Sequence, residues 1–373
     1  MRRVDIAIVG AGMAGASLAA ELAGHASVLI VEAEAAPGYH ATGRSAAFWT
    51  ESYGGPGVQP LTTASADLLG TPPADFAPAG FLRPRGALHL ADPSAFAALD
   101  AFEACFAGRG VALDRLDESA IRDRVPGLRA GPWRGLYEAS TADIDVAALH
   151  AAYLRAARRG GVALLCAAPL RSAERVGGHW RIAAGEETIA ADIVVDAAGA
   201  WADRVAMLAG ARPLGIRPYR RTMVQLRVDP PTSDALPLVL DAGGRYYFKP
   251  EAGGRLWLSP HDETPADPGD AAPEEIDVAT AIDRLAGVVD WRVERMERAW
   301  AGQRSFAPDR LPVYGFAPDT PGFFWFAGQG GFGIQTAPAA ARIGAALITG
   351  RAQHASVAGI DAARYAPDRF RPA

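Results

Sequence analysis

Three glycines near the start of the chain have the spacing of a phosphate-binding turn: Gly10, Gly12 and Gly15. The first permits a tight turn, the second lets a pyrophosphate approach the backbone, and the third lets a following helix pack closely on a strand. Glu32 lies 22 residues after Gly10, which is the distance at which an acid can bind the hydroxyls of a ribose. Together these residues predict a dinucleotide site.

The segments around these residues predict the strand–turn–helix–strand unit that such a site needs. Residues 6–9 form an unbroken apolar run, which is typical of a parallel strand covered on both faces. After the glycines, small residues predict a slim helix, whose free N–H groups and dipole favour a phosphate. A second apolar strand, residues 28–31, ends at Glu32. The order of these elements makes the glycine pattern specific.

The same N-terminus has one feature of a secretory signal, because Arg2 and Arg3 precede an apolar stretch. Asp5 interrupts that stretch at once, and Glu21 lies where it would have to continue. Removal of the segment would also delete the phosphate-binding turn. We therefore interpret it as part of the folded protein and expect a cytoplasmic location, either free or peripheral to the inner face of the membrane.

The composition excludes several classes of protein. The chain has 373 residues, which is enough for two domains, and a net charge of −5, which gives no basic field to attract nucleic acid. No apolar run approaches the roughly 20 residues of a transmembrane helix. Cys105 and Cys166 fit neither a metal motif nor a disulfide framework. The seven histidines form no metal pattern, and we expect structural roles for His40 and His89.

The middle of the chain first continues the α/β pattern of the first domain and then changes to a series of short strands. A helix is predicted at residues 146–159, a strand at 162–166, antiparallel strands at 174–182 and 188–190, and a buried strand at 192–196, followed by the small-residue turn Ala197, Ala198, Gly199. Residues 223–228, 236–240, 245–250 and 255–259 then predict an antiparallel meander.

After a predicted helix at residues 276–286, the C-terminal part returns to the α/β pattern. It predicts a strand at 323–328, a glycine-rich turn and a helix at 334–348. The predicted fold is therefore a discontinuous α/β Rossmann-like domain interrupted by an α+β domain built on an antiparallel sheet. We assign residues 1–84, 141–212 and 302–373 to the dinucleotide-binding domain, and residues 85–140 and 213–301 to the substrate-binding domain.

Four motifs in this order resemble the FAD-dependent D-amino-acid oxidase superfamily: GAGMAG, GYHATGRSAA, DIVVDAAGAWA and GQGGFGIQTAP. Within that superfamily, the stretches ADIDVAALHAAYLR, AGARPLGIRPYRRT, YYFKPEAG and WAGQRSF are most similar to bacterial D-arginine dehydrogenases. The resemblance covers nearly the whole chain. It implies an extended FAD molecule in the first domain and the oxidation of an amine in the second.

The resemblance also implies which residues bind FAD. Residues 306–314 correspond to the region that carries a flavin-linked cysteine in some superfamily members, and they contain none here, so we expect noncovalent FAD. The residues implied to bind it are Gly10, Ala11, Gly12, Met13, Ala14, Gly15, Glu32, Ala33, Gly43, Arg44, Ser45, Ala46, Val176, Ala198, Gly199, Trp201, Arg304, Gly330, Gly331, Phe332, Gly333, Ile334 and Gln335.

An amino-acid substrate brings a carboxylate, which pairs best with a buried bidentate arginine. By resemblance, Arg304 and Arg221 have this role, with Arg220 left as an alternative to Arg221. The hydroxyl of Tyr247 also reaches the carboxylate, and period-2 alternation places this side chain on the face opposite Tyr246 and Phe248. Tyr53 covers the substrate. The other implied pocket residues are Phe48, Thr50, Gly86, Gly331 and Gln335.

Gly86 departs from the D-arginine dehydrogenase pattern, in which a glutamate pairs with the substrate guanidinium. A guanidinium buried without that carboxylate would be costly, so we expect a neutral, apolar or aromatic D-amino acid, oxidised by hydride transfer from Cα to flavin N5 and converted through an imine to a 2-oxo acid and ammonia. A glycine or secondary-amine oxidase of the same fold, and a flavin protein without amine chemistry, stay open. The electron acceptor, whether a quinone, O2 or another, is not identified.

Overall fold

Strand β1 (Arg2–Val9) is the centre of an eight-stranded sheet in the first of two lobes. The computed structural model describes residues 1–370. β1 pairs in parallel with β2 (Val28–Val31) on one side and with β12 (Glu187–Asp196) on the other. Ile6 and Ile8 belong to one hydrophobic core, and Ala7 and Val9 to a second. Both faces of the strand are therefore buried, as its apolar run predicts.

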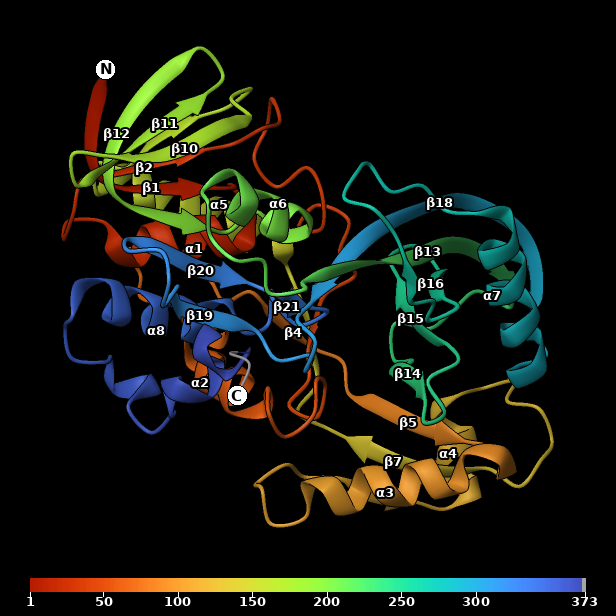
Figure 1. Ribbon diagram of the computed structural model, residues 1–373. Helices are drawn as coiled ribbons and strands as arrows, with labels where there is room; N and C mark the ends of the chain where they lie inside the picture. Colours follow the sequence, from red (N-terminus) through yellow and green to blue (C-terminus); the bar gives the residue numbers. More distant parts are fainter. Residues whose placement is uncertain (371–373) are drawn as a thin grey trace.

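Helices cover this sheet on the side of the first core. α1 (Met13–Leu22) packs against α5 (Val146–Arg159) and α8 (Ala337–Thr349). In Figure 1, α1 lies below β1, and α8 lies below β20 (Phe323–Ala327). β20 returns to the sheet from the C-terminal part of the chain and pairs in parallel with β12. This sheet therefore contains strands from both ends of the chain.

Two predicted strand assignments in this lobe are wrong. Residues 174–182 are not one strand, because Gly177 and Gly178, with φ of +59° and +89°, form a turn between β10 (Leu170–Val176) and β11 (His179–Ala184). Residues 188–190 and 192–196 are not separate, because β12 runs through both. Continuous pairing with β1 along its whole length holds β12 as one strand.

The second lobe contains a ten-stranded sheet with the order β21-β18-β13-β16-β15-β14-β5-β7-β6 and β17 on the side of β13. β13 (Arg217–Asp229) and β18 (Arg292–Phe306) are its longest strands, and they extend from the junction of the lobes into the second lobe (Figure 1). α7 (Glu275–Val288) packs on β13 and β16 (Arg255–Ser259). This sheet confirms the predicted α+β architecture.

The predicted meander is only partly correct. β14 (Leu238–Asp241), β15 (Tyr247–Glu251) and β16 are consecutive neighbours, but β13 pairs with β16 and β18 rather than with β14. β14 instead lies parallel to β5 (Ala87–Ala91), which comes from the earlier segment of the chain. The sheet is therefore assembled from strands far apart in sequence.

A three-stranded sheet has the order β3-β8-β4. In it, residues 142–144 pair with residues 48–49 on one side and 82–84 on the other. β21 pairs with β18 in the large sheet, although residues 302–373 were assigned to the first domain. The domain boundaries given from the sequence therefore stay a prediction. The elements not yet bounded are β3 (Phe48–Trp49), α2 (Gln59–Gly70), β4 (Leu82–Pro84), η1 (Pro93–Ala95), α3 (Phe96–Phe106), β6 (Asp114–Leu116), α4 (Glu118–Arg124), β7 (Arg134–Glu138), β8 (Ala142–Ile144), β9 (Ala163–Leu165), η2 (Gly199–Trp201), α6 (Ala202–Leu208), β17 (Thr264–Pro265), β19 (Val313–Phe316), β21 (Gln329–Gly330), η3 (Ala355–Val357), η4 (Ala362–Tyr365) and η5 (Pro367–Phe370).

Within residues 1–370, no helix combines the length and apolar character needed to cross a membrane.

Candidate functional site

A cavity of about 390 Å³ is lined by both lobes. Most of the residues expected to bind the cofactor line it, and they come from six separate stretches of the chain. The predicted cofactor residues that line it are Gly10, Gly12, Met13, Ala14, Glu32, Ala33, Arg44, Ser45, Ala46, Ala198, Gly199, Trp201, Arg304, Gly330, Gly331, Gly333 and Ile334.

The glycine turn lies between β1 and α1 at the wall of this cavity. Gly12 is the N-cap of α1 and makes no side-chain capping bond. The N–H of Met13 donates to Thr42 Oγ1 at 2.9 Å, and the dipole at this end of the helix favours an anion. Gly10 has φ of +102°, and a Cβ there would lie 2.5 Å from the carbonyl oxygen of Ala197. A Cβ on Gly15 would lie 1.9 Å from the carbonyl oxygen of Gly10. Gly15 therefore serves the packing of helix on strand and does not line the cavity.

Glu32 has two contacts that hold the turn in place. Its carboxylate accepts hydrogen bonds from the backbone N–H of Ala11 at 2.7 Å and of Glu34 at 3.0 Å. On the other side of the turn, His150 Nε2 is 2.9 Å from the carbonyl oxygen of Ala11, and burial lowers the pKa of this histidine. The neutral ring donates to that carbonyl. Ala11 thus supports the site through its backbone and does not line the cavity.

Four more predicted cofactor residues lie outside the main cavity. The backbone N–H of Gly43 donates to Gly38 and closes the loop before Arg44. Phe332 is buried between Val58 and Phe306. Gln335 lines a separate, smaller cavity.

Val176, the fourth of these residues, is 48% exposed at the end of β10. The backbone contact with adenine that the resemblance implies for it stays a prediction, whereas residues 168–170, near the start of that strand, do line the cavity.

Arg44 is at the cavity, but its guanidinium is engaged by the opposite lobe. It pairs with Asp270 and donates to the carbonyl oxygens of Ala271 at 2.8 Å and Ala301 at 3.1 Å. Gln303 binds the same loop through Asp267 and Gly269. Arg44 therefore fastens the loop of residues 267–271 over the cavity.

The glycine-rich turn before α8 differs from its prediction. Residues 331–336 are turns, and the helix begins at Ala337 with Pro338 in its first turn, three residues later than expected. Gly330 has φ of +55°, and a Cβ there would lie 2.2 Å from the ring of Phe306. Gly331, Gly333 and Ile334 reach the cavity from this turn rather than from the end of a helix.

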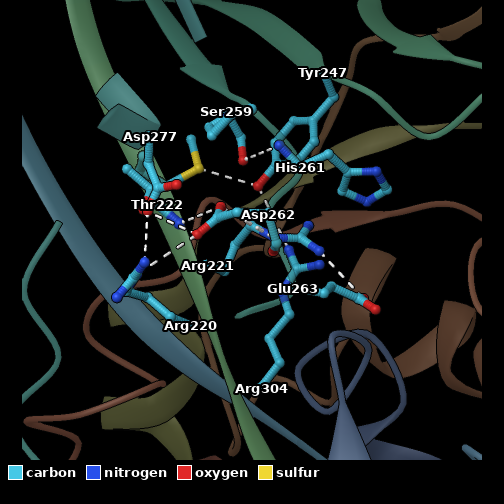
Figure 2. Close-up of polar contacts among 12 residues, drawn as sticks. Arg220, Arg221, Thr222, Tyr247, Ser259, His261, Asp262, Glu263, Asp277 and Arg304 are labelled. Carbon is cyan, nitrogen blue, oxygen red and sulfur yellow. Dashed lines mark hydrogen bonds and ion pairs between the residues drawn. The ribbon is translucent and has the colours of Figure 1, made fainter. Parts of the chain in front are cut away.

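Two arginines project from neighbouring strands into the same part of the cavity. Arg221 on β13 pairs with Gly302 on β18, and Tyr219 pairs with Arg304. Since side chains alternate along a strand, Arg221 and Arg304 share one face of the sheet on a diagonal. Both line the cavity. Arg220 points to the other face, where it pairs with Glu274 and with Asp277 at 2.8 Å (Figure 2), so the structure favours Arg221 over Arg220.

The surroundings of Arg221 leave part of its guanidinium without a partner. Its Nε donates to the carbonyl oxygen of Asp262 at 2.7 Å, and its Nη2 is 3.3 Å from Glu263. Nη1 is buried and has no hydrogen-bond partner among the described residues. Burial and the charge of Arg304 lower the pKa of Arg221. A buried donor of this kind favours an anionic ligand.

Tyrosine hydroxyls surround Arg304. Its Nη1 donates to Tyr53 at 2.7 Å, and its Nη2 is 3.5 Å from the hydroxyl of Tyr247. Tyr247 and Phe48 share one hydrophobic cluster, whereas Tyr246 belongs to another. The predicted alternation of the tyrosines is therefore confirmed, and the three residues expected around the carboxylate are brought together.

The remaining predicted pocket residues divide into lining and supporting positions. Phe48, Gly331 and Gln335 line a small cavity of about 20 Å³ beside Arg304. Thr50 is fully buried, and its backbone N–H donates to Gln335 at 3.2 Å. It supports the loop that carries Tyr53.

Gly86 lines neither cavity, and its assignment to the pocket is wrong. It has φ of +73°, and a Cβ there would lie 2.1 Å from the hydroxyl of Tyr137. The next residue, Ala87, packs with Phe48, Met223 and Tyr247. A side chain in this part of the sequence would reach the cluster from position 87 because successive strand residues face opposite sides.

Sequence reasoning missed a buried carboxylate that holds the loop of Tyr53. Glu138 is inaccessible to solvent and accepts hydrogen bonds from the backbone N–H of Glu51 at 2.8 Å and from the hydroxyl of Ser52 at 2.5 Å. His89 lies 3.6 Å from the same carboxylate, which agrees with the structural role expected for it. Nothing in the sequence around Glu138 marks this contact, because its partners are some 86 residues away.

His261 was also missed. Its Nδ1 lies 2.9 Å from the carbonyl oxygen of Gly244, to which it donates, and its ring packs edge-on against Tyr247. Burial and the charges of Arg221 and Arg304 lower its pKa to about 3, so this ring is neutral at physiological pH. Its position 14 residues after Tyr247, in a loop, carries no sequence signal.

Comparison with known proteins adds a family to this geometry. Residues 5–347 match the family described as FAD dependent oxidoreductase, or DAO. The chain is 30% identical over 259 residues to a glycine oxidase of Pseudomonas aeruginosa and 25% identical over 269 residues to the hydrogen cyanide synthase subunit HcnC of the same organism. These alignments cover 65% and 69% of this chain, but only 64% and 60% of the two relatives.

The fold extends over a complete solved structure. The crystal structure of glycine oxidase from Geobacillus kaustophilus superposes with a TM-score of 0.85, covering 99% of both chains at 24% sequence identity. At this identity the likeness concerns the fold alone.

Proposed function

Because the chain belongs to the DAO family of FAD-dependent oxidoreductases, we propose that it oxidises the amine of a neutral α-amino acid. Its cofactor is FAD. The residues fit this group, since the turn at Gly10 and Gly12 leaves backbone room for a pyrophosphate and Glu32 lies on the same cavity wall. Neither Cys105 nor Cys166 is among the residues that line the cavity, which supports noncovalent binding.

One observation carries the proposal: the buried Nη1 of Arg221 has no partner, and it lies on the sheet face shared with Arg304. Two guanidinium groups beside tyrosine hydroxyls are suited to a carboxylate, which accepts several charge-assisted hydrogen bonds. Arg221 has two acids nearby, Glu263 at 3.3 Å and the buried Asp262 at 3.8 Å, but Nη1 of Arg221 has no hydrogen-bond partner among the described residues.

The proposed mechanism assigns positioning to the protein. Arg221, Arg304 and Tyr247 fix the carboxylate and thereby orient the Cα–H bond, while Tyr53 covers the substrate and limits access of water. Bound FAD supplies the hydride acceptor. Loss of hydride from the neutral amine gives an imine, which water converts to a 2-oxo acid and ammonia. We assign no side chain as base, because water or desolvation can remove the ammonium proton.

The neighbourhood of Ala87 supports a neutral substrate side chain. Ala87 packs with Phe48, Met223, Leu240 and Tyr247, and the carboxylate of its strand partner Glu138 is already engaged by Glu51 and Ser52. A substrate guanidinium would be buried there without compensation. The D configuration is proposed from the resemblance to D-amino-acid dehydrogenases alone.

A second candidate is the oxidation of glycine or of a small secondary amine. The similarity to glycine oxidase supports it. The same arginines would bind the carboxylate, and the two candidates differ only in the substrate amine and side chain. The electron acceptor is not assigned in either case.

The test is anaerobic titration of the holoenzyme with D- and L-amino acids, glycine and sarcosine, following the flavin absorbance. Bleaching by neutral D-amino acids with little effect of D-arginine or the L-forms supports the first candidate. Bleaching by glycine or sarcosine alone supports the second. A flavin that no amine reduces would contradict both.

Arg304→Gln tests the carboxylate site directly. We expect its KM for the best substrate to rise about 10- to 100-fold, since a charged hydrogen bond contributes about 1.5–3 kcal/mol. Arg220→Gln is the matched control: it should lower the melting temperature, because Arg220 anchors α7, yet leave KM within about twofold. Equal effects of both variants on KM would contradict the assignment.

A further inference from the structure

We propose that Glu263 is a specificity-determining residue that competes with the substrate carboxylate for Arg221. In this proposal, which rests on the proposed function, Arg310 draws Glu263 away when a carboxylate binds. The affinity of the site is therefore set by the balance between the two arginines that share Glu263.

Glu263 bridges a buried and an exposed guanidinium. Its Oε1 is 3.3 Å from Nη2 of Arg221 and 2.9 Å from Nη2 of Arg310, while Oε2 is 3.0 Å from the same nitrogen of Arg310. Figure 2 shows the carboxylate turned toward the guanidinium groups beneath Tyr247. The contact with Arg221 is the longer one and is made by one oxygen only.

The acids around Arg221 differ in how firmly they are held. Asp262 accepts hydrogen bonds from the backbone N–H of Thr222 at 2.7 Å and from its hydroxyl at 3.0 Å. Its carboxylate is thus held on β13 by two hydrogen bonds from Thr222. Glu263 has a side chain that is 35% exposed, against 4% for Arg221, and its other partner is Arg310, half exposed. Glu263 is therefore the acid that can leave Arg221 at little cost.

The backbone on both sides of this contact is constrained. The described residues include three non-glycine residues with positive φ, and two of them are His261, at +55°, and Arg310, at +65°. One lies two residues before Glu263 and the other is its partner. Such conformations are strained in non-glycine residues and are typical of ligand clamps. Here they place the Glu263–Arg310 pair beside the carboxylate site.

The charges predict the consequence. A substrate carboxylate that binds Nη1 of Arg221 lies close to Glu263, and two like charges at such short range repel each other. Removal of the Glu263 charge should therefore tighten binding. Removal of the Arg310 charge should weaken it, because Glu263 then has Arg221 as its remaining cationic partner.

The experiment measures the Kd of benzoate for the holoenzyme from the change in flavin absorbance. Benzoate carries the carboxylate without the amine, so it isolates this contact. We expect Glu263→Gln to bind about 3- to 10-fold more tightly and Arg310→Gln about 3- to 10-fold more weakly than the unmodified protein. The double variant should match Glu263→Gln, because Arg310 acts through Glu263. Glu263→Ala provides a second test of the same direction.

The possible failures are distinct. Shifts of both single variants in the same direction, or additive effects in the double variant, would show a merely structural ion pair and overturn the inference while leaving the carboxylate site intact. If the unmodified protein binds no benzoate and no amino acid bleaches its flavin, the proposed function fails and this inference fails with it.

Discussion

The site depends on the guanidinium groups of Arg221 and Arg304, which lie close together and whose positive charge is only partly neutralised by nearby acids. Arg304 donates to tyrosine hydroxyls. Arg221 donates to a main-chain carbonyl and, at 3.3 Å, to Glu263, which also binds Arg310. Neutral acceptors orient the guanidinium groups but neutralise little of their charge. The remaining charge is what an anionic substrate can use. Burial and the charge of Arg304 both destabilise the charged form of Arg221, and they lower its pKa.

At the residue scale, Tyr247→Phe tests the hydroxyl beside Arg304. The hydroxyl also lies 3.0 Å from Sδ of Met223. We expect KM to rise about fivefold, because the loss of one hydrogen bond costs about 1 kcal/mol. Steady-state kinetics with the best amine substrate provide the measurement.

The matched control is the neighbouring residue on the opposite face. The hydroxyl of Tyr246 is buried and has no partner among the described residues. Tyr246→Phe should leave KM unchanged and keep or raise the melting temperature. A rise in KM for this variant equal to that of Tyr247→Phe would refute the assigned geometry.

At the scale of elements, the contact between β1 and α1 fixes the cofactor turn. α1 is short, at 10 residues, and lacks a side-chain cap. It is held by close packing on β1 at Gly15 and by contacts with α5 and α8. Tertiary packing, rather than a side-chain cap at Gly12, therefore stabilises the helix next to the cofactor turn.

Gly15→Ala tests this contact. Its Cβ would lie 1.9 Å from the carbonyl oxygen of Gly10, so α1 must move away from β1. We expect the purified protein to lose most of its FAD and to melt at a lower temperature. The FAD content follows from the ratio of absorbance at 450 and 280 nm.

Gly287→Ala is the control for the same chemical change. Gly287 lies in α7, where a Cβ meets no atom within 4 Å. This variant should keep its FAD and gain about 0.5–1 kcal/mol in the free energy of unfolding. Full FAD content in Gly15→Ala would speak against the close helix–strand contact.

On the scale of the whole molecule, the two lobes are joined around one shared cavity. β18 carries Arg304 to it, and Arg44 from the first lobe binds the loop of residues 267–271 from the second. Because residues of both lobes line this cavity, FAD bound there is expected to stabilise the complete molecule by mass action. The free energy of unfolding should also depend on the protonation of a buried acid at the end of β12.

Asp196 is that acid. It is inaccessible to solvent, and burial raises its pKa well above the ordinary value. The native state thus keeps a proton that the unfolded chain releases, so the free energy of unfolding falls as pH rises between the two pKa values. Asp196→Asn removes this dependence. Its advantage over the unmodified protein should be small near pH 4 and grow by up to about 1.4 kcal/mol per pH unit above it.

Urea unfolding of both FAD-saturated proteins at several pH values between 4.5 and 8 checks this expectation. The asparagine can still accept the hydrogen bond that Ala198 donates to Oδ1, so the local backbone should be unaffected. Parallel stability curves for the two proteins would contradict the raised pKa of Asp196.

The sequence by itself determined the features that depend on near neighbours. The spacing of glycines and apolar residues predicted β1, α1 and β2, the bounds of α5 agree with its 3.6-residue pattern, and alternation placed Tyr247 opposite Tyr246. These features follow from local periodicity, which each segment carries in its own residues.

The tertiary structure decided everything that depends on which distant segments meet. The pairing of β13 with β16 and β18, the supporting carboxylate of Glu138 and the positions of His261 and Glu263 have no local signal. The assignment of Gly86 to the pocket was wrong for the same reason. A shift of one residue along a strand reverses the face of the side chain, and Ala87 therefore reaches the pocket cluster where Gly86 was expected.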